Sequence, residues 1–244
     1  MTIKILIAGA NGKMGLETQK AIKESSQFEY ASGINRNDDL SEAIKLHKPK
    51  IVIDLTNADA VFKNTQIIIE NNVHPVIGSS GLTKDQIELL SSKCSAKKLG
   101  AIIAPNFSIG AILMMQFAKQ AAKYFNDAEI IEMHHQGKLD SPSGTAIKTA
   151  ELINENIKNS EKSDQNYKEV LKHSRGANLE NIAIHSLRMP GCIANQDVIF
   201  GGPGETLTIS HKTIDRKCFM AGVLLACRKV IKLESMIYGL ENII

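Results

Sequence analysis

Short apolar runs alternate with amphipathic stretches through the first hundred residues of the chain. Five of these runs have the length of a buried strand. They are IKILIAG (3–9), EYASGIN (29–35), IVIDLT (51–56), HPVIGSS (74–80) and AIIAPN (101–106). Stretches with helical periodicity lie between them, for example residues 14–25 and 83–96. Strands that alternate with helices are typical of βαβ units, so the pattern predicts a parallel sheet covered by helices.

The pattern changes in the second half. A long helix is predicted over about residues 109–125, and strand-like runs then follow with few helices between them. The runs are AEIIEMHH (128–135), IAIHSLRM (182–189), DVIFGG (197–202) and ETLTISHK (205–212). This order predicts a mixed or antiparallel sheet, and hence a second domain. Residues 154–181, rich in Asn, Lys, Glu and Ser, are predicted as a helix end followed by a long mobile loop.

Residues 215–231 return to a helical pattern and are predicted to pack on the first domain. The predicted fold class is therefore α/β. A Rossmann-type parallel sheet of residues 1–108, completed by residues 216–244, forms a dinucleotide-binding domain, and residues 109–215 form a second, mixed α+β domain.

Composition narrows the classes of partner. Hydrophobic residues make up 43% of the 244 positions and charged residues 23%, which predicts a packed core. Aromatic residues make up only 5%, there is no Trp, and the formal net charge is +3. This argues against nucleic acid as a partner and allows a small anionic substrate. No apolar run approaches the roughly 20 residues needed to span a bilayer, so no membrane association is predicted.

Cysteine usage and the N-terminal segment both favour a cytoplasmic protein. Cys94, Cys192, Cys218 and Cys227 form no CxxC pair and no zinc-type spacing. They are predicted as free thiols in a reducing compartment, and no metal site is predicted. The first apolar run lacks a basic segment and a cleavage site, so it reads as a strand and not as a signal peptide.

A glycine-rich turn, GANGKMG (9–15), follows the first predicted strand and opens the first predicted helix. Its three glycines give G-x-x-G-x-x-G, with Asn11 where the usual G-x-G-x-x-G motif has its second glycine. Asn tolerates left-handed backbone angles, so the turn can still bring backbone and a helix N-terminus to a pyrophosphate. This context favours a dinucleotide site over a purely structural turn. The predicted cofactor-binding residues here are Gly9, Ala10, Asn11, Gly12, Lys13 and Met14.

The end of the second predicted strand bears on the choice of nicotinamide cofactor. An acidic residue there would bind the ribose hydroxyl of NAD, but the strand ends with Asn35 and Arg36. Arg36 could pair with the 2′-phosphate of NADP, or it could be an ordinary exposed loop residue, and the sequence leaves both readings open. The predicted cofactor is NADPH or NADH, with NADPH modestly favoured.

Residues 128–146, AEIIEMHHQGKLDSPSGTA, resemble the signature of the dihydrodipicolinate reductase (4-hydroxy-tetrahydrodipicolinate reductase) family, E-x-H-H-x-x-K-x-D-x-P-S-G-T-A. Other segments are similar to further family motifs. They are GANGKMG (9–15), GSSG (78–81), APNFSIG (104–110), HSLRMPG (185–191) and GETLTISHK (204–212). The resemblance therefore covers most of the chain.

The resemblance implies an NAD(P)H-dependent reductase of the diaminopimelate and lysine pathway. It implies that His134 is the catalytic proton donor and acceptor and that Lys138 is the second proton donor. The implied substrate contacts are His135, Ser143, Gly144 and Thr145, and the implied additional cofactor contacts are Gly78, Ser79, Ser80, Ala104, Pro105, Asn106 and Phe107. It also implies that the second domain binds substrate and builds a homotetramer through its sheet.

The residue types suit this chemistry independently. The substrate that the resemblance implies is a small dicarboxylate, and Ser143–Thr145 stand where a helix is predicted to begin. Amide groups at a helix N-terminus bind carboxylates, and Lys138 can supply a compact positive charge. Hydride addition to a conjugated imine leaves negative charge that a proton must quench, and a histidine suits that role.

The chain departs from the family pattern at two places. Residues 193–196 read Ile-Ala-Asn-Gln where the family commonly has V-G-x-H, and Pro190 interrupts the H-S-x-R segment. Their effect on the local geometry of the sheet is left open. His47, His74 and His173 are predicted as ordinary packed or surface residues.

Two other functions remain to be separated from the first. One is a two-domain nicotinamide oxidoreductase that acts on a different small acid. The other is a redox-sensing module that binds NADP(H) without chemistry, although such a module would not need both His134 and Lys138. Turnover of the cofactor with the imine substrate separates both from the leading hypothesis.

Overall fold

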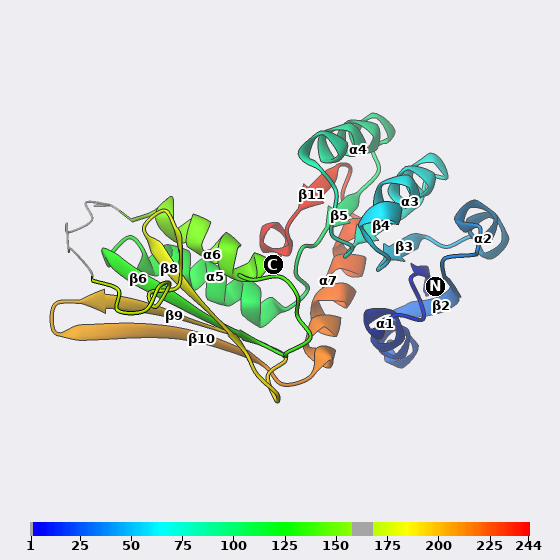
Figure 1. The fold of residues 1–244 in the computed structure, drawn as a ribbon. Coiled ribbons are helices and arrows are strands. Elements are labelled where there is room, and N and C mark those ends of the chain that lie inside the picture. The colour runs from blue at the N-terminus through cyan, green and yellow to red at the C-terminus, as the bar shows by residue number, and fades with distance from the viewer. Residues whose placement is uncertain (1, 158–167) are drawn as a thin grey trace. The chain divides into compact units, whose positions relative to one another are not determined.

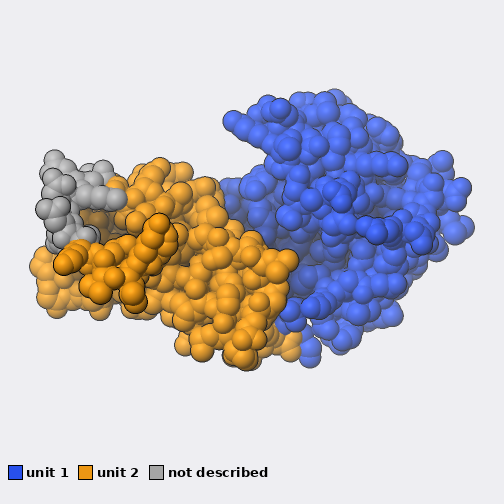
Figure 2. Space-filling view, in the orientation of Figure 1, with its two compact units in different colours: residues 1–109, 216–244 blue, residues 110–215 orange. Residues whose placement is uncertain are grey.

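The computed structural model describes residues 2–157 and 168–244 (Figure 1). The chain forms two compact units, which Figure 2 colours separately. Unit 1 consists of Met1–Ile109 and Arg216–Ile244, and unit 2 is Gly110–Asp215. Unit 2 is thus inserted into the sequence of unit 1.

Unit 1 is built on a six-stranded sheet in which every neighbouring pair is parallel. Its strands are β1 (Ile3–Ala8), β2 (Phe28–Ile34), β3 (Ile51–Asp54), β4 (His74–Ile77), β5 (Ala101–Ile103) and β11 (Met236–Tyr238). Its helices are α1 (Lys13–Glu24), α2 (Leu40–His47), α3 (Ala58–Glu70), α4 (Lys84–Lys97), α7 (Met220–Val230) and the short 3₁₀ helices η1 (Arg216–Phe219) and η2 (Leu240–Asn242). The strand order is β11-β5-β4-β3-β1-β2.

Helices cover both faces of this sheet. The chain moves from β1 to β2 in one direction and then steps back across β1 to β3, β4 and β5. Because crossovers are right-handed, α1 lies on one face and α2, α3 and α4 lie on the other. Helix α7 packs against α1 and completes the first layer. Residues 5–8 and 51–53 are fully buried between these layers, which explains their unbroken apolar runs.

Side-chain caps fix the starts of three helices in unit 1. Asp39 accepts a hydrogen bond from the amide of Glu42, Asn57 caps α3, and Thr83 and Gln86 form a capping box for α4. Helix α1 differs, since its N-cap is Gly12 and no side chain in the described part of the chain caps it. The N-terminus of α1 is therefore the one left open to an external acceptor among these four.

Unit 2 is built on a five-stranded mixed sheet with the order β10-β9-β6-β8-β7. Its elements are α5 (Ile109–Ala121), β6 (Asp127–His134), α6 (Gly144–Asn154), β7 (Ala177–Leu179), β8 (Ile182–Arg188), β9 (Ala194–Gly202) and β10 (Glu205–Thr213). Strands β6 and β8 are parallel, and the other pairs are antiparallel. Figure 1 shows α5 and α6 along one face of this sheet. Period-two alternation along β6 turns Ile130, Glu132 and His134 toward that helix-covered face.

The predicted fold class is confirmed, while several element boundaries differ. Strand β11 was not predicted, and β7 lies inside the predicted loop of residues 154–181. Residues 158–167 of that loop fall outside the described residues. The predicted C-terminal helix is divided into η1 and α7. Among the residues that the structure describes, no helix is long and apolar enough to cross a membrane.

Candidate functional site

The residues predicted to bind the cofactor lie at one edge of the parallel sheet in unit 1. The turn of residues 9–14 follows β1, Arg36 follows β2, residues 78–80 follow β4, and residues 104–107 follow β5. The strands are parallel, so their carboxyl ends meet at the same edge, where α/β sheets bind their ligands. The sheet therefore gathers segments that are up to a hundred residues apart in the sequence.

The glycine turn fits closely against its surroundings. Gly9 has a φ of +83°, and a Cβ at this position would lie 2.5 Å from the backbone oxygen of Leu55. A Cβ on Gly15 would lie 2.3 Å from the oxygen of Gly9, which leaves no room for a side chain. The first turn of α1 is thereby drawn against the loop that precedes it. Residues 11–13 of the turn are exposed, and the turn has no side chain at Gly9, Gly12 and Gly15, so its backbone can closely approach a ligand.

Asn35 ties the second strand to this turn. Its side-chain oxygen accepts a hydrogen bond from the backbone amide of Asn11 at 2.9 Å. The backbone amide of Asn35 donates to the carboxylate of Asp38 at 2.7 Å. Arg36 is exposed beside it and makes no hydrogen bond or ion pair within residues 2–157 and 168–244. The guanidinium of Arg36 is thus the available cation at the end of β2.

Asp54 is a buried residue at this edge to which the sequence analysis gave no role. It ends β3, is fully buried, and accepts hydrogen bonds from the Ser79 hydroxyl at 2.5 Å and from the Asn64 amide at 2.9 Å. The amide and hydroxyl of Thr56 also donate to it, at 3.0 and 2.6 Å. Asp54 therefore anchors the loop that follows β4. Its position as a lone acidic residue at the end of an apolar run is the sequence feature that could have identified it.

Residues 104–107 are held by the neighbouring strand and by close packing. The Ala104 amide donates to the oxygen of Ile77, and the side chain of Asn106 accepts a hydrogen bond from the amide of Ser108. The Phe107 ring packs so closely on Gly78 that a Cβ there would lie 2.5 Å from the ring. The two predicted cofactor loops after β4 and β5 are thus in direct contact.

In unit 2, the predicted acid His134 lies at the end of β6 within a cluster of charged groups. The Nδ1 atom of His134 lies 2.5 Å from a carboxylate oxygen of Glu132, which is fully buried. Both terminal nitrogens of Arg188 donate to the two oxygens of Glu132, each at 2.9 Å. Parallel pairing of β6 with β8 places His134 directly opposite Arg188. The fork of the guanidinium therefore meets the carboxylate in a bidentate arrangement.

The pKa values of this cluster reflect competing effects. Burial raises the pKa of Glu132, but hydrogen bonds from Arg188, Ser186 and His134 outweigh it and leave that pKa below the usual value. Burial lowers the pKa of His134, and the nearby charges of Lys138 and Arg188 lower it further, while Glu132 raises it. The net shift for His134 is downward, so the imidazole is largely neutral near pH 7 and poised to exchange a proton.

Lys138 lies on the loop between β6 and α6. Its ammonium contacts both carboxylate oxygens of Asp140 at 2.7 Å. This hydrogen bond is the main reason that the pKa of Asp140 is lowered. Arg188 also donates to the backbone oxygen of Asp140 at 2.8 Å, which fixes the loop to the end of β8. Arg188 thus contacts both Glu132, the partner of His134, and the loop that carries Lys138.

The predicted carboxylate-binding segment opens α6. Ser143 is its N-cap, and the serine hydroxyl accepts a hydrogen bond from the amide of Ala146 at 3.2 Å. The amide of Ser143 itself donates to Glu132 at 3.2 Å. Gly144 is exposed, and a Cβ placed on it would meet no atom within 4 Å. The first turn of α6 therefore presents an accessible helix N-terminus a short distance along the chain from His134.

The departures at residues 190–196 do not interrupt the sheet. Residues 190 and 191 lie in the turn between β8 and β9, and β9 pairs with β6 in continuous register from Ala194 to Gly201. Gln196 lies opposite Glu132 and is buried. Its amide donates to the Thr149 hydroxyl, which donates in turn to the backbone oxygen of Thr145. The glutamine thus supports the first turn of α6, while its own Oε1 is buried and has no hydrogen-bond partner among the described residues.

The remaining histidines have separate environments. His135 follows the end of β6, outside the Glu132 cluster. His185 lies on the other face of the sheet, 2.8 Å from Glu129. His211 lies opposite Gln196, and burial lowers its pKa. His74 is a buried residue whose ring nitrogen lies 2.9 Å from the oxygen of Gly100, in line with its predicted structural role.

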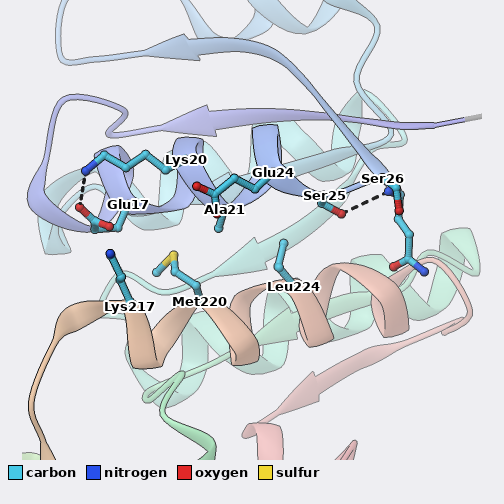
Figure 3. Close-up of a pocket in the computed structure, with 10 residues that line it drawn as sticks. Glu17, Lys20, Ala21, Glu24, Ser25, Ser26, Lys217, Met220 and Leu224 are labelled. Atoms are coloured by element: carbon cyan, nitrogen blue, oxygen red, sulfur yellow. Dashed lines mark hydrogen bonds and ion pairs between the residues drawn. The ribbon is translucent and has the colours of Figure 1, made fainter.

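One hollow in unit 1 shares no residue with these sites. It has a volume of about 620 Å³ and is drawn in Figure 3. Its lining residues are Glu17, Lys20, Ala21, Glu24, Ser25, Ser26, Gln27, Lys217, Met220 and Leu224. The charged groups of Glu17 and Lys20 already pair at 2.8 Å. Within the described ranges, no cluster of His, Cys, Asp or Glu is arranged to hold a metal ion.

Comparisons with known proteins decide the family. The family profile described as "Dihydrodipicolinate reductase, N-terminus" matches residues 3–107, and the one described as "Dihydrodipicolinate reductase, C-terminus" matches residues 110–244. The chain belongs to the dihydrodipicolinate reductase family. It is therefore a reductase whose Rossmann-type domain takes NADH or NADPH.

Several relatives are similar over their whole length. The 4-hydroxy-tetrahydrodipicolinate reductases of Coxiella burnetii and Legionella pneumophila are 51% and 49% identical over 244 residues, which is 100% of each chain. A dipicolinate-bound dihydrodipicolinate reductase from Paenisporosarcina sp. TG-14 is 40% identical, with a TM-score of 0.92 and 100% coverage of both chains. The predicted family and its reductase activity are confirmed, while the roles of individual residues stay predictions.

Proposed function

We propose that the cluster around His134 reduces 4-hydroxy-tetrahydrodipicolinate, or the dihydrodipicolinate formed from it, to tetrahydrodipicolinate. The proposal rests on one observation: a partly buried histidine, paired with a fully buried carboxylate, lies at the end of β6 and is linked through Glu132 to the helix N-terminus of α6. Relatives identical at about half of all positions carry the name of this reaction. The reaction belongs to diaminopimelate and lysine biosynthesis.

Unit 1 has the features that a dinucleotide requires. Gly9 and Gly15 exclude side chains, and the uncapped N-terminus of α1 is available for a pyrophosphate. Asn35 brings no negative charge to the end of β2, so a 2′-phosphate meets no repulsion there, and Arg36 can pair with it. We therefore assign residues 9–14, Arg36, 78–80 and 104–107 to the cofactor. The bound nicotinamide supplies the hydride.

Unit 2 supplies binding and proton transfer. The first turn of α6, at Gly144 and Thr145, holds one substrate carboxylate, and His135 and Ser143 complete the substrate pocket. Overall, one hydride and one proton are added, and the 4-hydroxyl group leaves as water. Lys138 serves as the second donor and protonates the departing hydroxyl once it exchanges Asp140 for the substrate. His134 accepts the ring proton that is lost with that hydroxyl and later returns a proton to the ring from its imidazolium form, so one proton is added in total. The positive charges of Lys138 and Arg188 also favour an anionic substrate.

The chain acts as a cytoplasmic homotetramer in this proposal. Helices α5 and α6 cover one face of the five-stranded sheet, and its other face carries Ile131, Leu187 and Ile199, which are partly exposed. An apolar sheet face of this kind suits association with identical copies. Light scattering of the purified chain would test the tetramer directly.

The activity is tested by NADPH oxidation with substrate generated by the preceding synthase. His134→Gln and Lys138→Met are each expected to lower kcat by roughly 10²–10⁴-fold, because a positioned proton donor contributes that much. The dissociation constant for NADPH should remain within about twofold. His173→Gln and Lys148→Met replace exposed residues of the same types and serve as matched controls. An unmodified enzyme that fails to consume NADPH, or variants with normal kcat, would contradict the proposal.

A further inference from the structure

We infer that Glu132 is a positioning residue that holds His134, Arg188 and the start of α6 in one hydrogen-bonded cluster. The inference rests on the proposed role of His134 as the proton donor. It extends that role to a residue whose side chain is fully buried and therefore does not touch solvent.

The contacts of Glu132 reach three separate parts of unit 2. One oxygen accepts from Arg188 and lies 2.5 Å from His134, and the other accepts from Arg188 and from the amide of Ser143. Those partners come from β8, from the end of β6 and from the N-cap of α6. A carboxylate so surrounded is fixed in place, because moving it would break hydrogen bonds in several directions at once.

The hydrogen-bonding capacity of the Glu132 carboxylate determines the tautomer of neutral His134. An ionised carboxylate only accepts hydrogen bonds, so the neutral imidazole must carry its hydrogen on Nδ1. This leaves Nε2 without a hydrogen and pointing away from Glu132. When His134 is protonated, the transferable proton is therefore on Nε2, and Glu132 keeps that atom directed outward.

The charges that face His134 come from three elements. Glu132 on β6 favours the protonated imidazole, while Lys138 on the following loop and Arg188 on β8 disfavour it. Glu132 raises the pKa of His134, while burial and the two cations lower it. Removing the charge of Glu132 therefore lowers the pKa of His134 further. If protonated His134 is the acid, activity declines as pH rises through that pKa. The declining limb must then move to lower pH in a variant without the carboxylate.

The same strand contains a natural control. Glu129 lies three residues earlier on the opposite face of the sheet and also pairs with a histidine and an arginine, His185 and Arg175. Its side chain is 37% exposed, whereas that of Glu132 is fully buried. Glu129→Gln therefore makes the same chemical change in a similar trio outside the site.

The first experiment uses the unmodified enzyme and does not depend on turnover. Nitrogen NMR of protein labelled at histidine should show neutral His134 with its hydrogen on Nδ1, assigned by its loss in His134→Gln. A neutral His134 with its hydrogen on Nε2 would overturn the inference while leaving the reductase activity intact. This outcome is therefore distinguishable from failure of the proposed function, which would appear as absence of NADPH oxidation.

The second experiment is a pH profile of kcat for three variants. Glu132→Gln should lower kcat by about 10²-fold or more and move the declining limb to lower pH. Glu132→Asp keeps the charge with a shorter reach, so it should lower kcat but leave the limb nearer its original place. Glu129→Gln should change neither quantity. A Glu132→Gln variant that folds, keeps a normal kcat and leaves the declining limb in place would refute the inference. If Glu132→Gln fails to fold, the pH profile of Glu132→Asp and the NMR result test the inference instead.

Discussion

The carboxyl edge of the parallel sheet in unit 1 and the polar cluster of unit 2 are built by opposite means. At the edge, Gly9 and Gly15 lie where any side chain would collide with backbone, and an uncapped helix faces outward. In the cluster, Glu132, His134 and Arg188 satisfy one another through short charged contacts. The edge depends on positions that have no side chain, whereas the cluster depends on contacts between charged and polar side chains.

The two designs should fail in different ways. At the edge, a methyl group added to Gly9 or Gly15 would collide with backbone atoms, so the backbone itself would have to move. The cluster has a buried charge at its centre, so removing one partner leaves another charge unpaired at a cost of several kcal/mol. Variants that add atoms to the edge and variants that remove polar contacts near the cluster should therefore separate cofactor binding from substrate turnover.

The largest effect on ligand binding is expected at Gly15. In Gly15→Ala, the new Cβ would lie 2.3 Å from the oxygen of Gly9 and 2.6 Å from that of Ala10. The turn must open, so the dissociation constant for NADPH should rise about 100-fold or more, and the free energy of unfolding should fall by about 1–3 kcal/mol. Fluorescence titration and denaturant unfolding measure these two quantities. Gly201→Ala is the control, because its Cβ would have ordinary space, 3.9 Å from Asp127; equal loss in both variants would contradict the argument.

A smaller effect is expected at Arg36. We expect both cofactors to be used, with NADPH favoured by about tenfold, which corresponds to ~1.4 kcal/mol. Arg36→Ala should erase most of this preference by raising the KM for NADPH alone, because its guanidinium is the available cation at the end of β2. High salt should weaken the preference in the unmodified enzyme. Lys45→Ala removes another exposed cation as a control. Equal losses with NADH and NADPH would show that Arg36 does not read the 2′-phosphate.

The smallest effect is expected at Gln196, which supports the cluster from the neighbouring strand. Gln196→Met removes the hydrogen bond to Thr149 and keeps the side-chain volume similar. One hydrogen bond contributes about 0.5–1.5 kcal/mol, so the KM for the dicarboxylate should rise on the order of threefold while that for NADPH stays constant. Thr149→Val should give the same change without adding to it in the double variant. Additive losses would place the two residues in separate roles.

The sequence predicted the edge of unit 1 more fully than the cluster of unit 2. The glycine turn is a local feature, with strand, turn and helix in consecutive order, so its glycine spacing and the periodicity on either side locate it. The bidentate contact with Glu132 depends on Arg188, which is 56 residues away in the sequence, and on the register of β6 against β8. No local pattern encodes that register, and the predicted strand of residues 197–202 lacked the first three residues of β9, which include Gln196 opposite Glu132.

Short strands were also hidden from the sequence. Strands β7 and β11 have three residues each, which is too few to establish a period of two. Strand β11 is defined by its parallel pairing with residues 101–103, and those residues are more than 130 positions earlier. Its existence follows from tertiary contacts and not from local propensity.

The return of the chain to unit 1 after residue 215 has a consequence for the order of synthesis. Helix α7 and strand β11, which pack against β4, β5 and α1, are made last, although the sheet they complete is begun first. At a translation rate of roughly 5–20 residues per second, unit 2 has been synthesised for a second or more before strand β11, at one edge of the parallel sheet, is available. Unit 1 is therefore the last part of the protein able to reach its finished form, and nascent chains should complete unit 2 before they complete unit 1.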